Sequence, residues 1–377
     1  MKRIAIAVAV ALTGTHAIAQ QTVKIASIVE LSGPGTTSGT NFRNGIDMAV
    51  KEINAAGGIL GRRIAVETND TQSNPAVAKA LAVKAIDSDA YVVMGPVFSG
   101  SIIVSMAETR RAEVPNFTGG EAANITLQGN PYVFRTSFSQ ATGMPKIANY
   151  MQSGLKAKSV VVMFVNNDFG KGGRDQIIKE LGARNIKVAA DISTDQGQVD
   201  FSSPVLRAKQ VNADALFAYL NEEESARLLR ELRKQGYDKP IVGETTIMGQ
   251  KVIELAGDAA NGVKGHVGLT IDAPIAGIRA FSEKYEREFK FKSDHNGIKG
   301  YTGIYVVKAV TEKIGKFDRK AFAAAMKNAC FSAKQHPGVL MDLCFDDKGD
   351  IDRDSFLVEV RGGKQVVVET LPPLSRK

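Results

Sequence analysis

The hydrophobic residues of the chain alternate between two patterns. Short, nearly continuous apolar runs, such as residues 159–165, are typical of strands buried on both faces of a parallel sheet. Between these runs, apolar residues recur at helical spacing, which predicts amphipathic helices. The runs predict strands at residues 23–29, 63–69, 91–94, 114–117, 159–165, 187–192, 215–219, 241–243 and 263–267. The helical spacing predicts helices at residues 41–56, 75–86, 99–111, 169–181, 222–235, 275–291, 296–314 and 319–328.

The order of these elements predicts two α/β units. Strand and helix alternate up to residue 117, and the same alternation begins again at residue 159. This order favours parallel sheets with helices on both faces. Residues 137–143 are the expected crossing between the two units. Near the end of the chain, residues 344–350 predict a turn, and residues 355–360 and 365–369 predict a hairpin.

The first 20 residues have the pattern of a secretory signal peptide. Lys2 and Arg3 precede a short apolar run at residues 4–12, and the sequence Ala-Ile-Ala at residues 17–19 matches a cleavage site. We therefore expect cleavage near Ala19 and a periplasmic location. No Cys follows the cleavage pattern, which argues against a bacterial lipid anchor. No later apolar stretch approaches the roughly 20 residues that a membrane-spanning helix needs.

Composition supports a large folded protein and argues against a nucleic-acid partner. The chain has 377 residues, of which 44% are hydrophobic, so two domains are expected. The net charge is +8, yet Lys and Arg are mixed with Glu and Asp, as in residues 225–235. Such mixing is typical of solvated helix faces, whereas nucleic-acid binders cluster their basic residues.

The chain contains two cysteines, Cys330 and Cys344. Export makes a disulfide chemically possible, and this pair would close a short loop. Two cysteines need not face each other, so the sequence leaves the bridge open. No flanking pattern supports a catalytic thiol.

The motifs of common enzyme, cofactor and metal sites are missing. Residues 31–39 follow a strand, but Ser38 stands where a dinucleotide motif needs glycine, which favours a tight turn lining a cleft. The histidines beyond the first 20 residues show no metal-ligand spacing, and residues 346–350 lack the alternating acids of a calcium loop. We expect no enzyme activity, cofactor or metal, although catalytic groups distant in sequence leave an enzyme open.

Residues 95–101 carry the strongest candidate chemistry. This Gly-Pro-Val-Phe-Ser-Gly-Ser segment lies where a strand ends and a helix begins. Ligands of open α/β sheets bind beyond the carboxyl ends of strands, and a helix N-terminus offers free N–H groups. Together with the hydroxyls of Ser99 and Ser101, these groups predict a site for a small carboxylate. The alternative is that Ser99 only caps the helix.

Residues 117–121 form a second candidate. Gly119 and Gly120 would let a ligand approach the backbone closely. Glu121 would then receive a ligand ammonium. The alternative is a solvent-facing Glu in a turn.

Several segments make the chain resemble one family over nearly its full length. They are residues 31–34, 49–61, 69–70, 74–75, 95–101, 134–136, 167–170 and 345–350. The stretch Ile-Asn-Ala-Ala-Gly-Gly-Ile at residues 53–59 is especially characteristic. These segments resemble the periplasmic leucine/isoleucine/valine-binding proteins, the type I solute-binding proteins of ABC transporters.

The resemblance implies an α/β fold of two doubly wound parallel-sheet lobes joined by a three-crossing hinge. Residues 21–139 and 273–344 would form the first lobe, and residues 140–272 and 345–377 the second. The ligand would lie between the lobes. By position, Ser99 resembles the serine that binds the ligand carboxylate, and Phe169 resembles an aromatic that covers the ligand. The implied site comprises Ser38, Val97, Phe98, Ser99, Gly119, Gly120, Glu121, Phe169, Asn221 and Thr245.

The chain departs from the family at its charged positions. The family's amino-acid binders usually place Glu where Thr245 stands, whereas Glu244 is one residue away and Glu121 replaces a small hydroxyl residue. Either the counter-charge for an ammonium has moved to the other lobe, or the ligand has no ammonium. Ser38 and Asn221 replace aromatics, which implies a wider or wetter pocket.

The resemblance implies a periplasmic component of an ABC importer. It would bind a small amino acid of the branched-chain type, close about its hinge, and deliver the ligand to a membrane permease. The alternatives are an aromatic or other small carboxylate without an ammonium group, or a ligand sensor module of the same fold.

Overall fold

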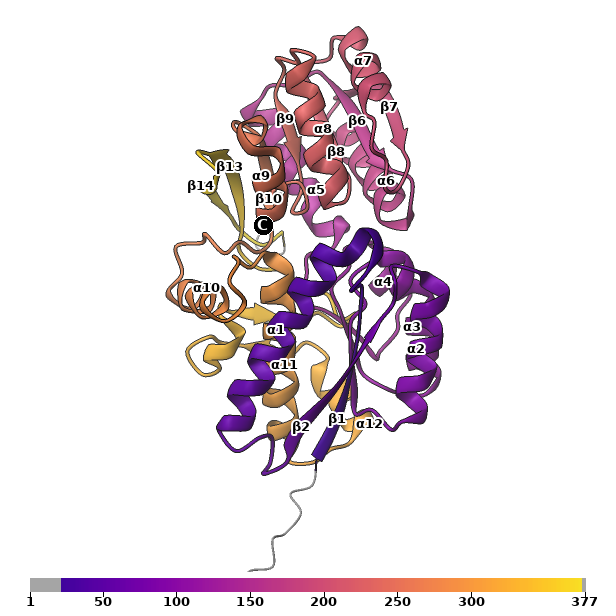
Figure 1. The fold of residues 1–377 in the computed structure, drawn as a ribbon, viewed down its shortest axis with the longest axis vertical. Coiled ribbons are helices and arrows are strands. Elements are labelled where there is room, and N and C mark those ends of the chain that lie inside the picture. Colours follow the sequence, from indigo (N-terminus) through magenta and orange to yellow (C-terminus); the bar gives the residue numbers. More distant parts are fainter. Residues whose placement is uncertain (1–21, 375–377) are drawn as a thin grey trace, which may run out of the picture.

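The computed structural model describes residues 22–374 as two α/β lobes stacked along the long axis of the molecule (Figure 1). The predicted signal peptide lies outside the described residues. Each lobe is built on a sheet with helices on both faces, so the predicted fold class is confirmed.

The first lobe contains a five-stranded, wholly parallel sheet in the order β2-β1-β3-β4-β5. Its strands are β1 (Thr22–Val29), β2 (Arg63–Asp70), β3 (Val92–Met94), β4 (Asn116–Thr118) and β5 (Val133–Arg135). Helices α1 (Thr36–Ala55) and α11 (His295–Ile314) pack together on one side, and α2 (Pro75–Asp87) and α3 (Ser99–Arg111) on the other. The lobe also contains α4 (Asn124–Leu127), α10 (Ala276–Phe289) and α12 (Arg319–Met326).

The second lobe contains a seven-stranded sheet in the order β14-β13-β10-β9-β8-β6-β7. Its parallel strands are β6 (Ser159–Val165), β7 (Lys187–Thr194), β8 (Ala215–Tyr219), β9 (Ile241–Gly243) and β10 (Lys264–Val267). The predicted hairpin, β13 (Ser355–Arg361) and β14 (Lys364–Leu371), adds an antiparallel edge. The helices are α5 (Gln140–Asn149), α6 (Asp168–Ala183), α7 (Ser202–Val211), α8 (Glu222–Lys234) and α9 (Gln250–Ala256). Because they cover both faces, β8 is buried along its whole length.

The chain passes between the two sheets three times. It leaves the first sheet after β5, returns between β10 and α10, and leaves again between the first-lobe strand β12 (Leu343–Cys344) and β13. Several crossings restrict how the lobes can move relative to each other and favour a hinge over a free tether.

The structure corrects one predicted helix boundary and adds several elements that the sequence analysis did not predict. The helix expected from residue 41 begins at Thr36, because its polar first turn packs at the end of β1, where a Cβ on Gly39 would lie 2.0 Å from the carbonyl oxygen of Glu30. The first crossing follows β5 and overlaps the expected segment, residues 137–143, which is helical from Gln140 onward. The sequence analysis did not predict strand β5 or helices α5, α7 and α9, because these elements are short. Helix α5 also contains Pro145, which is unusual inside a helix.

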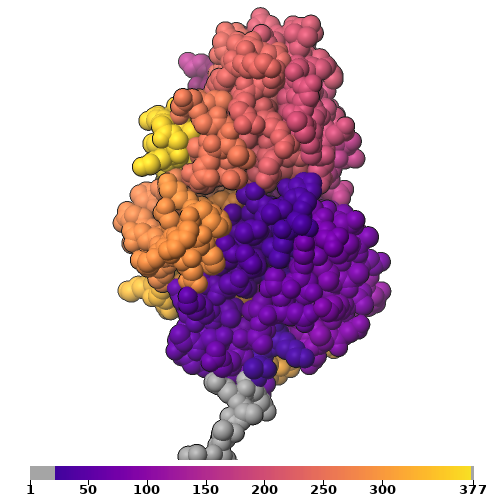
Figure 2. Space-filling model, in the orientation of Figure 1, coloured from indigo at the N-terminus to yellow at the C-terminus, as the bar shows by residue number. Residues whose placement is uncertain are grey.

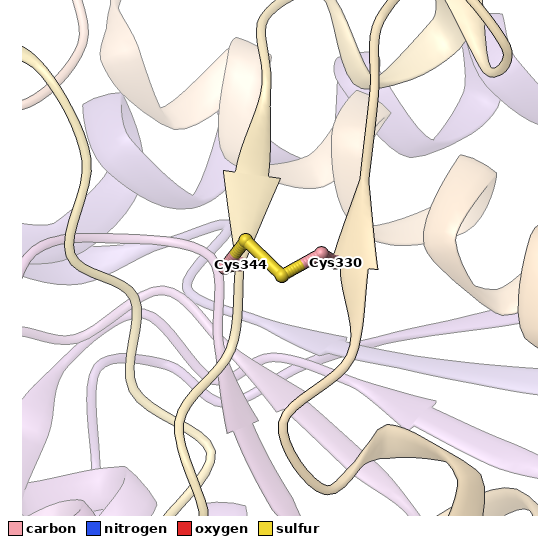
Figure 3. Close-up of a disulfide and its surroundings, with 2 residues drawn as sticks. All are labelled: Cys330 and Cys344. Atoms are coloured by element: carbon pink, nitrogen blue, oxygen red, sulfur yellow. A yellow bond between two sulfur atoms is a disulfide. The ribbon is translucent and has the colours of Figure 1, made fainter.

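The two cysteines form a disulfide (Figure 3). Cys330 and Cys344 face each other on the short antiparallel pair β11 (Cys330–Phe331) and β12, with a Cα–Cα distance of 4.0 Å. The bridge that the sequence left open is therefore present, and it closes a loop in the first lobe.

Candidate ligand-binding site

A cavity lies between the two lobes at the N-terminal ends of α3, α6, α8 and α11, and we call it the inter-lobe cavity. The surfaces of the two lobes meet across the middle of the molecule in Figure 2. The cavity volume is about 120 Å³. A dry protein cavity of about 150 Å³ holds benzene, so this cavity has the size of a small amino acid or a one-ring acid.

Nine of the ten predicted site residues line this cavity. They are Ser38, Val97, Phe98, Ser99, Gly119, Gly120, Glu121, Phe169 and Asn221. Thr245 does not line it, and Thr246 does. The reason is local, because the backbone N–H and the hydroxyl of Thr245 both donate to a carboxylate oxygen of Glu244, at 2.6 Å each.

The first-lobe wall is the start of α3. Phe98 occupies the N-cap position, so the interpretation of Ser99 as a helix cap is wrong. Glu30 accepts the N–H groups of Val97 and Phe98, each at 3.1 Å. The N–H groups of residues 99–101 have no partner within the helix. Among the described residues, the buried Ser101 hydroxyl has no hydrogen-bond partner. This wall can therefore receive an anion without using a basic side chain.

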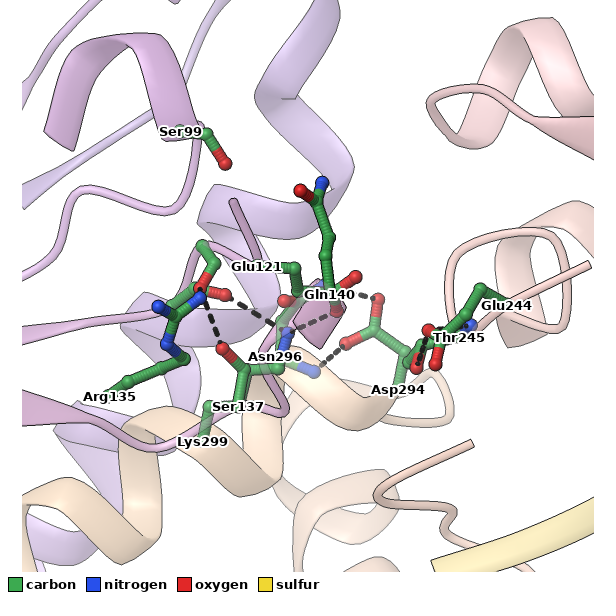
Figure 4. A network of polar contacts seen from close by, with 12 residues as sticks. Ser99, Glu121, Arg135, Ser137, Gln140, Glu244, Thr245, Asp294, Asn296 and Lys299 are labelled. Atoms are coloured by element: carbon green, nitrogen blue, oxygen red, sulfur yellow. Dashed lines mark hydrogen bonds and ion pairs between the residues drawn. The ribbon is translucent and has the colours of Figure 1, made fainter. Parts of the chain in front are cut away.

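Glu121 is already paired (Figure 4). Its carboxylate lies 3.3 Å from the ammonium of Lys299, which also donates to the carbonyl oxygen of Gly119 at 3.1 Å. The Tyr219 hydroxyl donates to the same carboxylate at 3.3 Å from the second lobe. Burial raises the pKa of Glu121, and the charge of Lys299 opposes that rise. Glu121 therefore neutralises Lys299, which leaves it less suited to a ligand ammonium than the sequence suggested.

Glu244 is also committed to protein groups. It contacts Nδ1 of the buried His266 as well as Thr245. Burial tends to raise its pKa, but His266 and the hydrogen bonds from Thr245 hold the pKa below its ordinary value. Glu244 does not line the cavity, so it does not replace the missing family Glu by a one-residue shift.

The second-lobe wall combines an aromatic and an acidic surface. The ring of Phe169, which lines the cavity, stacks on Tyr219 with centroids 4.2 Å apart. Asn221 is the N-cap residue of α8, and its amide donates to Glu224 at 3.2 Å. Glu222, the first residue of α8, faces the cavity and is 4% exposed.

The start of α11 completes the cavity with residues that sequence reasoning missed. Asp294 caps this helix by accepting the N–H groups of Asn296 and Gly297 at 2.7 and 3.3 Å, and burial raises its pKa to about 6. His295 and Asn296 line the cavity. Burial and the nearby Lys299 lower the pKa of His295 well below its ordinary value, so its imidazole is neutral at pH 7.

Within residues 22–374, no cluster of three or more His, Cys, Asp or Glu side chains is arranged to hold a metal ion. No helix in this part of the chain has the length and apolar character needed to cross a membrane.

Comparisons with known proteins agree with the two-lobed fold. A sequence model of the family described as "Periplasmic binding protein" matches residues 22–365. The leucine-, isoleucine-, valine-, threonine- and alanine-binding protein of Pseudomonas aeruginosa is 26% identical over 368 residues, 95% of each chain. The isoleucine complex of a branched-chain amino acid substrate-binding protein from Streptococcus pneumoniae has a TM-score of 0.84 at 25% identity and covers 94% of this chain and 100% of its own. A benzoate complex of a solute-binding protein from Rhodopseudomonas palustris has the same fold, with a TM-score of 0.84 at 23% identity, covering 93% and 97%.

Proposed function

The chain belongs to the periplasmic binding protein family, whose members are solute-binding proteins rather than enzymes, and from this premise we propose its ligand and its partner. We propose that it binds a small amino acid of the branched-chain type between its lobes, in the periplasm, and delivers it to an ABC permease. The lobe boundaries implied by the resemblance, at residues 139/140, 272/273 and 344/345, are part of this proposal.

One observation supports the ligand site above the others. The inter-lobe cavity has, in one wall, the free N-terminus of α3 and the unpartnered hydroxyl of Ser101, as judged over the described residues. A carboxylate placed there would accept several N–H and O–H groups and would meet the positive end of the helix dipole. Among the charged groups of a free amino acid, only the carboxylate suits this wall.

Contacts between the lobes support closure on the ligand. The hydroxyl of Thr37 donates to Glu223 at 2.8 Å, and Tyr219 reaches Glu121 across the same gap. These bonds join residues of different lobes, so they break when the hinge opens. A ligand that touches both walls adds its own contacts to the closed state and shifts the population toward it. A permease that recognises the closed form would then distinguish loaded from empty protein.

An aromatic carboxylate is the second candidate. The stacked pair Phe169 and Tyr219 offers a flat apolar surface, and the benzoate-bound neighbour shows that this fold accepts such a ligand. The two candidates share the carboxylate and differ in the ammonium, so their discrimination depends on charge.

Isothermal titration tests the proposal. The protein is unfolded, dialysed and refolded to remove any co-purified ligand, and is then titrated with leucine, isoleucine, valine and benzoate. We expect micromolar or tighter binding of at least one branched-chain amino acid, with a decrease in the radius of gyration measured by small-angle scattering. Binding of benzoate alone would favour the second candidate. The absence of binding by every small carboxylate would refute the proposed site.

A further inference from the structure

The first turn of α8 contains three consecutive acids that have different surroundings. Glu223 accepts the hydroxyl of Thr37 at 2.8 Å. Glu224 accepts the N–H of Gly197 at 2.6 Å and the amide of Asn221 at 3.2 Å. Within residues 22–374, the Glu222 carboxyl has no hydrogen-bond or ion-pair partner other than its own backbone N–H. It is nevertheless buried and lines the inter-lobe cavity.

The charged groups that affect Glu222 most are negative, and Lys299, the basic side chain of the same cavity, is paired with Glu121. Burial raises the pKa of Glu222 well above its ordinary value, and Glu223, Asp294 and Glu224 raise it further. A buried carboxylate without a counter-ion is costly, and the usual remedies are protonation or a cationic partner. Because its described neighbours provide no cation, Glu222 is either protonated in the empty cavity or neutralised by a cation that enters with the ligand.

The other carboxyls of the cavity have no such need. Glu121 is paired with Lys299 and Tyr219. Asp168 is exposed at the rim, where water solvates it. Asp294 is satisfied as the cap of α11 and does not line the cavity. Glu222 is therefore the one cavity-lining carboxyl of the described residues that is both buried and unpaired.

We propose that Glu222 receives the ammonium group of the ligand, while the N-terminus of α3 holds the carboxylate from the opposite lobe. This inference rests on the proposed function and specifies it, because it makes the ligand a zwitterion. It also assigns the ammonium contact to the first turn of α8, not to the turn near Thr245 or to Glu121. Since Glu222 belongs to the second lobe, the ammonium contact forms only when the lobes close. The amine therefore contributes to closure as well as to affinity.

The test compares ligands that differ only in the amine. L-Leucine and 4-methylpentanoate have the same carbon skeleton and carboxylate, and only leucine has the ammonium. Both are titrated into the wild type, into Glu222→Gln and into Glu223→Gln. The last variant is the matched control for the preference between the two ligands, because it removes the adjacent charge from the same helical turn outside the cavity and keeps an oxygen that can accept the Thr37 hydroxyl.

We expect the wild type to bind leucine roughly 100-fold more tightly than 4-methylpentanoate, which is typical of a desolvated charge pair. Glu222→Gln should weaken leucine binding by roughly 100-fold and leave 4-methylpentanoate unchanged or slightly tighter. Glu223→Gln should preserve the wild-type preference between the two ligands. Without ligand, Glu222→Gln should unfold at the same or a higher temperature, because it removes an uncompensated buried acid.

Three results would overturn the inference. The first is equal weakening of both ligands in Glu222→Gln, which would make Glu222 a structural residue. The second is tighter binding of 4-methylpentanoate than of leucine by the wild type, which would keep the carboxylate site but exclude the ammonium. The third is loss of the preference for leucine in Glu223→Gln as well as in Glu222→Gln. That result would mean that the preference comes from the total negative charge at the start of α8 and not from Glu222 itself. If neither ligand binds and benzoate does not bind, the proposed function fails together with this inference.

Discussion

The two lobes face the cavity with the same structural element and opposite chemistry. In the first lobe, β3 leads into α3, whose first three residues are Ser99, Gly100 and Ser101. In the second lobe, β8 leads into α8, whose first three residues are all Glu. Both helices point their N-terminal ends at the ligand space. One wall is neutral and has free N–H groups, whereas the other has its own acids.

The difference shows how one motif serves two purposes. A helix N-terminus attracts negative charge, and that charge can come from a ligand or from the first turn of the helix itself. In α3 the small hydroxyl residues leave the position open for a ligand anion. In α8 the acids already occupy it, so a cation suits this wall better. Closure brings the two walls together around a molecule with both charges.

The largest expected effect comes from giving α3 the chemistry of α8. Ser99→Asp places a carboxylate at the open helix end, and we expect it to weaken every carboxylate ligand by at least roughly 1,000-fold, because like charges in a closed site repel strongly. Ser203→Asp is the matched control, since Ser203 is an exposed first-turn residue of α7 outside the cavity. Isothermal titration measures both variants, and undiminished binding by Ser99→Asp would contradict the role of the first-lobe wall.

The next effect concerns the ion pair between Glu121 and Lys299, which keeps the first-lobe wall of the cavity neutral. Lys299→Met leaves Glu121 buried without its cation, and we expect it to lower the free energy of unfolding by about 3–5 kcal/mol. The double variant Lys299→Met with Glu121→Gln should recover most of this loss, because no uncompensated charge remains. Urea denaturation measures both. Equal stabilities of the single and double variants would show that the two charges do not depend on each other.

A smaller effect is expected from removing the hydroxyls of the α3 wall. Ser99→Ala together with Ser101→Ala should weaken binding by roughly 100-fold, the usual scale for two hydrogen bonds to a charged group. The loss should be the same for leucine and for 4-methylpentanoate, because both present the same carboxylate. A loss confined to leucine would mean that this wall recognises the amine, which would reverse the assignment of the two walls.

The smallest effect is a pH dependence from Glu30, which supports the start of α3. Burial raises its pKa from the ordinary value of 4.5 to about 7. The folded protein therefore binds more protons than the unfolded chain between these values, so Glu30 stabilises the fold most below pH 4.5. That contribution decreases as the pH rises through 7. Between pH 5 and 7.5 we expect the free energy of unfolding to fall by about 2 kcal/mol relative to Glu30→Gln. Urea denaturation at both pH values gives this difference, and parallel pH profiles would contradict it.

The sequence predicted those parts of the fold that depend on neighbours along the chain. The continuous apolar run at residues 159–165 became β6, and the segment at residues 95–101 ended β3 and began α3 at Ser99. Short helices with weak periodicity, such as α5 with its internal proline, were missed. Their stability depends on packing between elements, which the periodicity of one segment does not reveal.

Site residues that directly follow the end of a strand could be predicted from the sequence. Site residues whose role depends on contacts with segments far away in the sequence were missed. Lys299 looked like one more polar position in a long helix, yet it pairs with Glu121 across 178 positions of sequence. Thr246 lines the cavity and Thr245 does not, because the turn after β9 directs Thr245 toward Glu244. Glu222 resembled an ordinary first-turn acid, and only burial without a partner distinguishes it.

A crystal structure of the refolded protein with L-leucine tests the central claim most directly. The account predicts electron density between the lobes, with the leucine carboxylate within about 3 Å of the N–H groups that begin α3. It also predicts the ammonium at hydrogen-bond distance from Glu222. Leucine outside the inter-lobe cavity, or bound there with its carboxylate directed toward α8, would contradict the account.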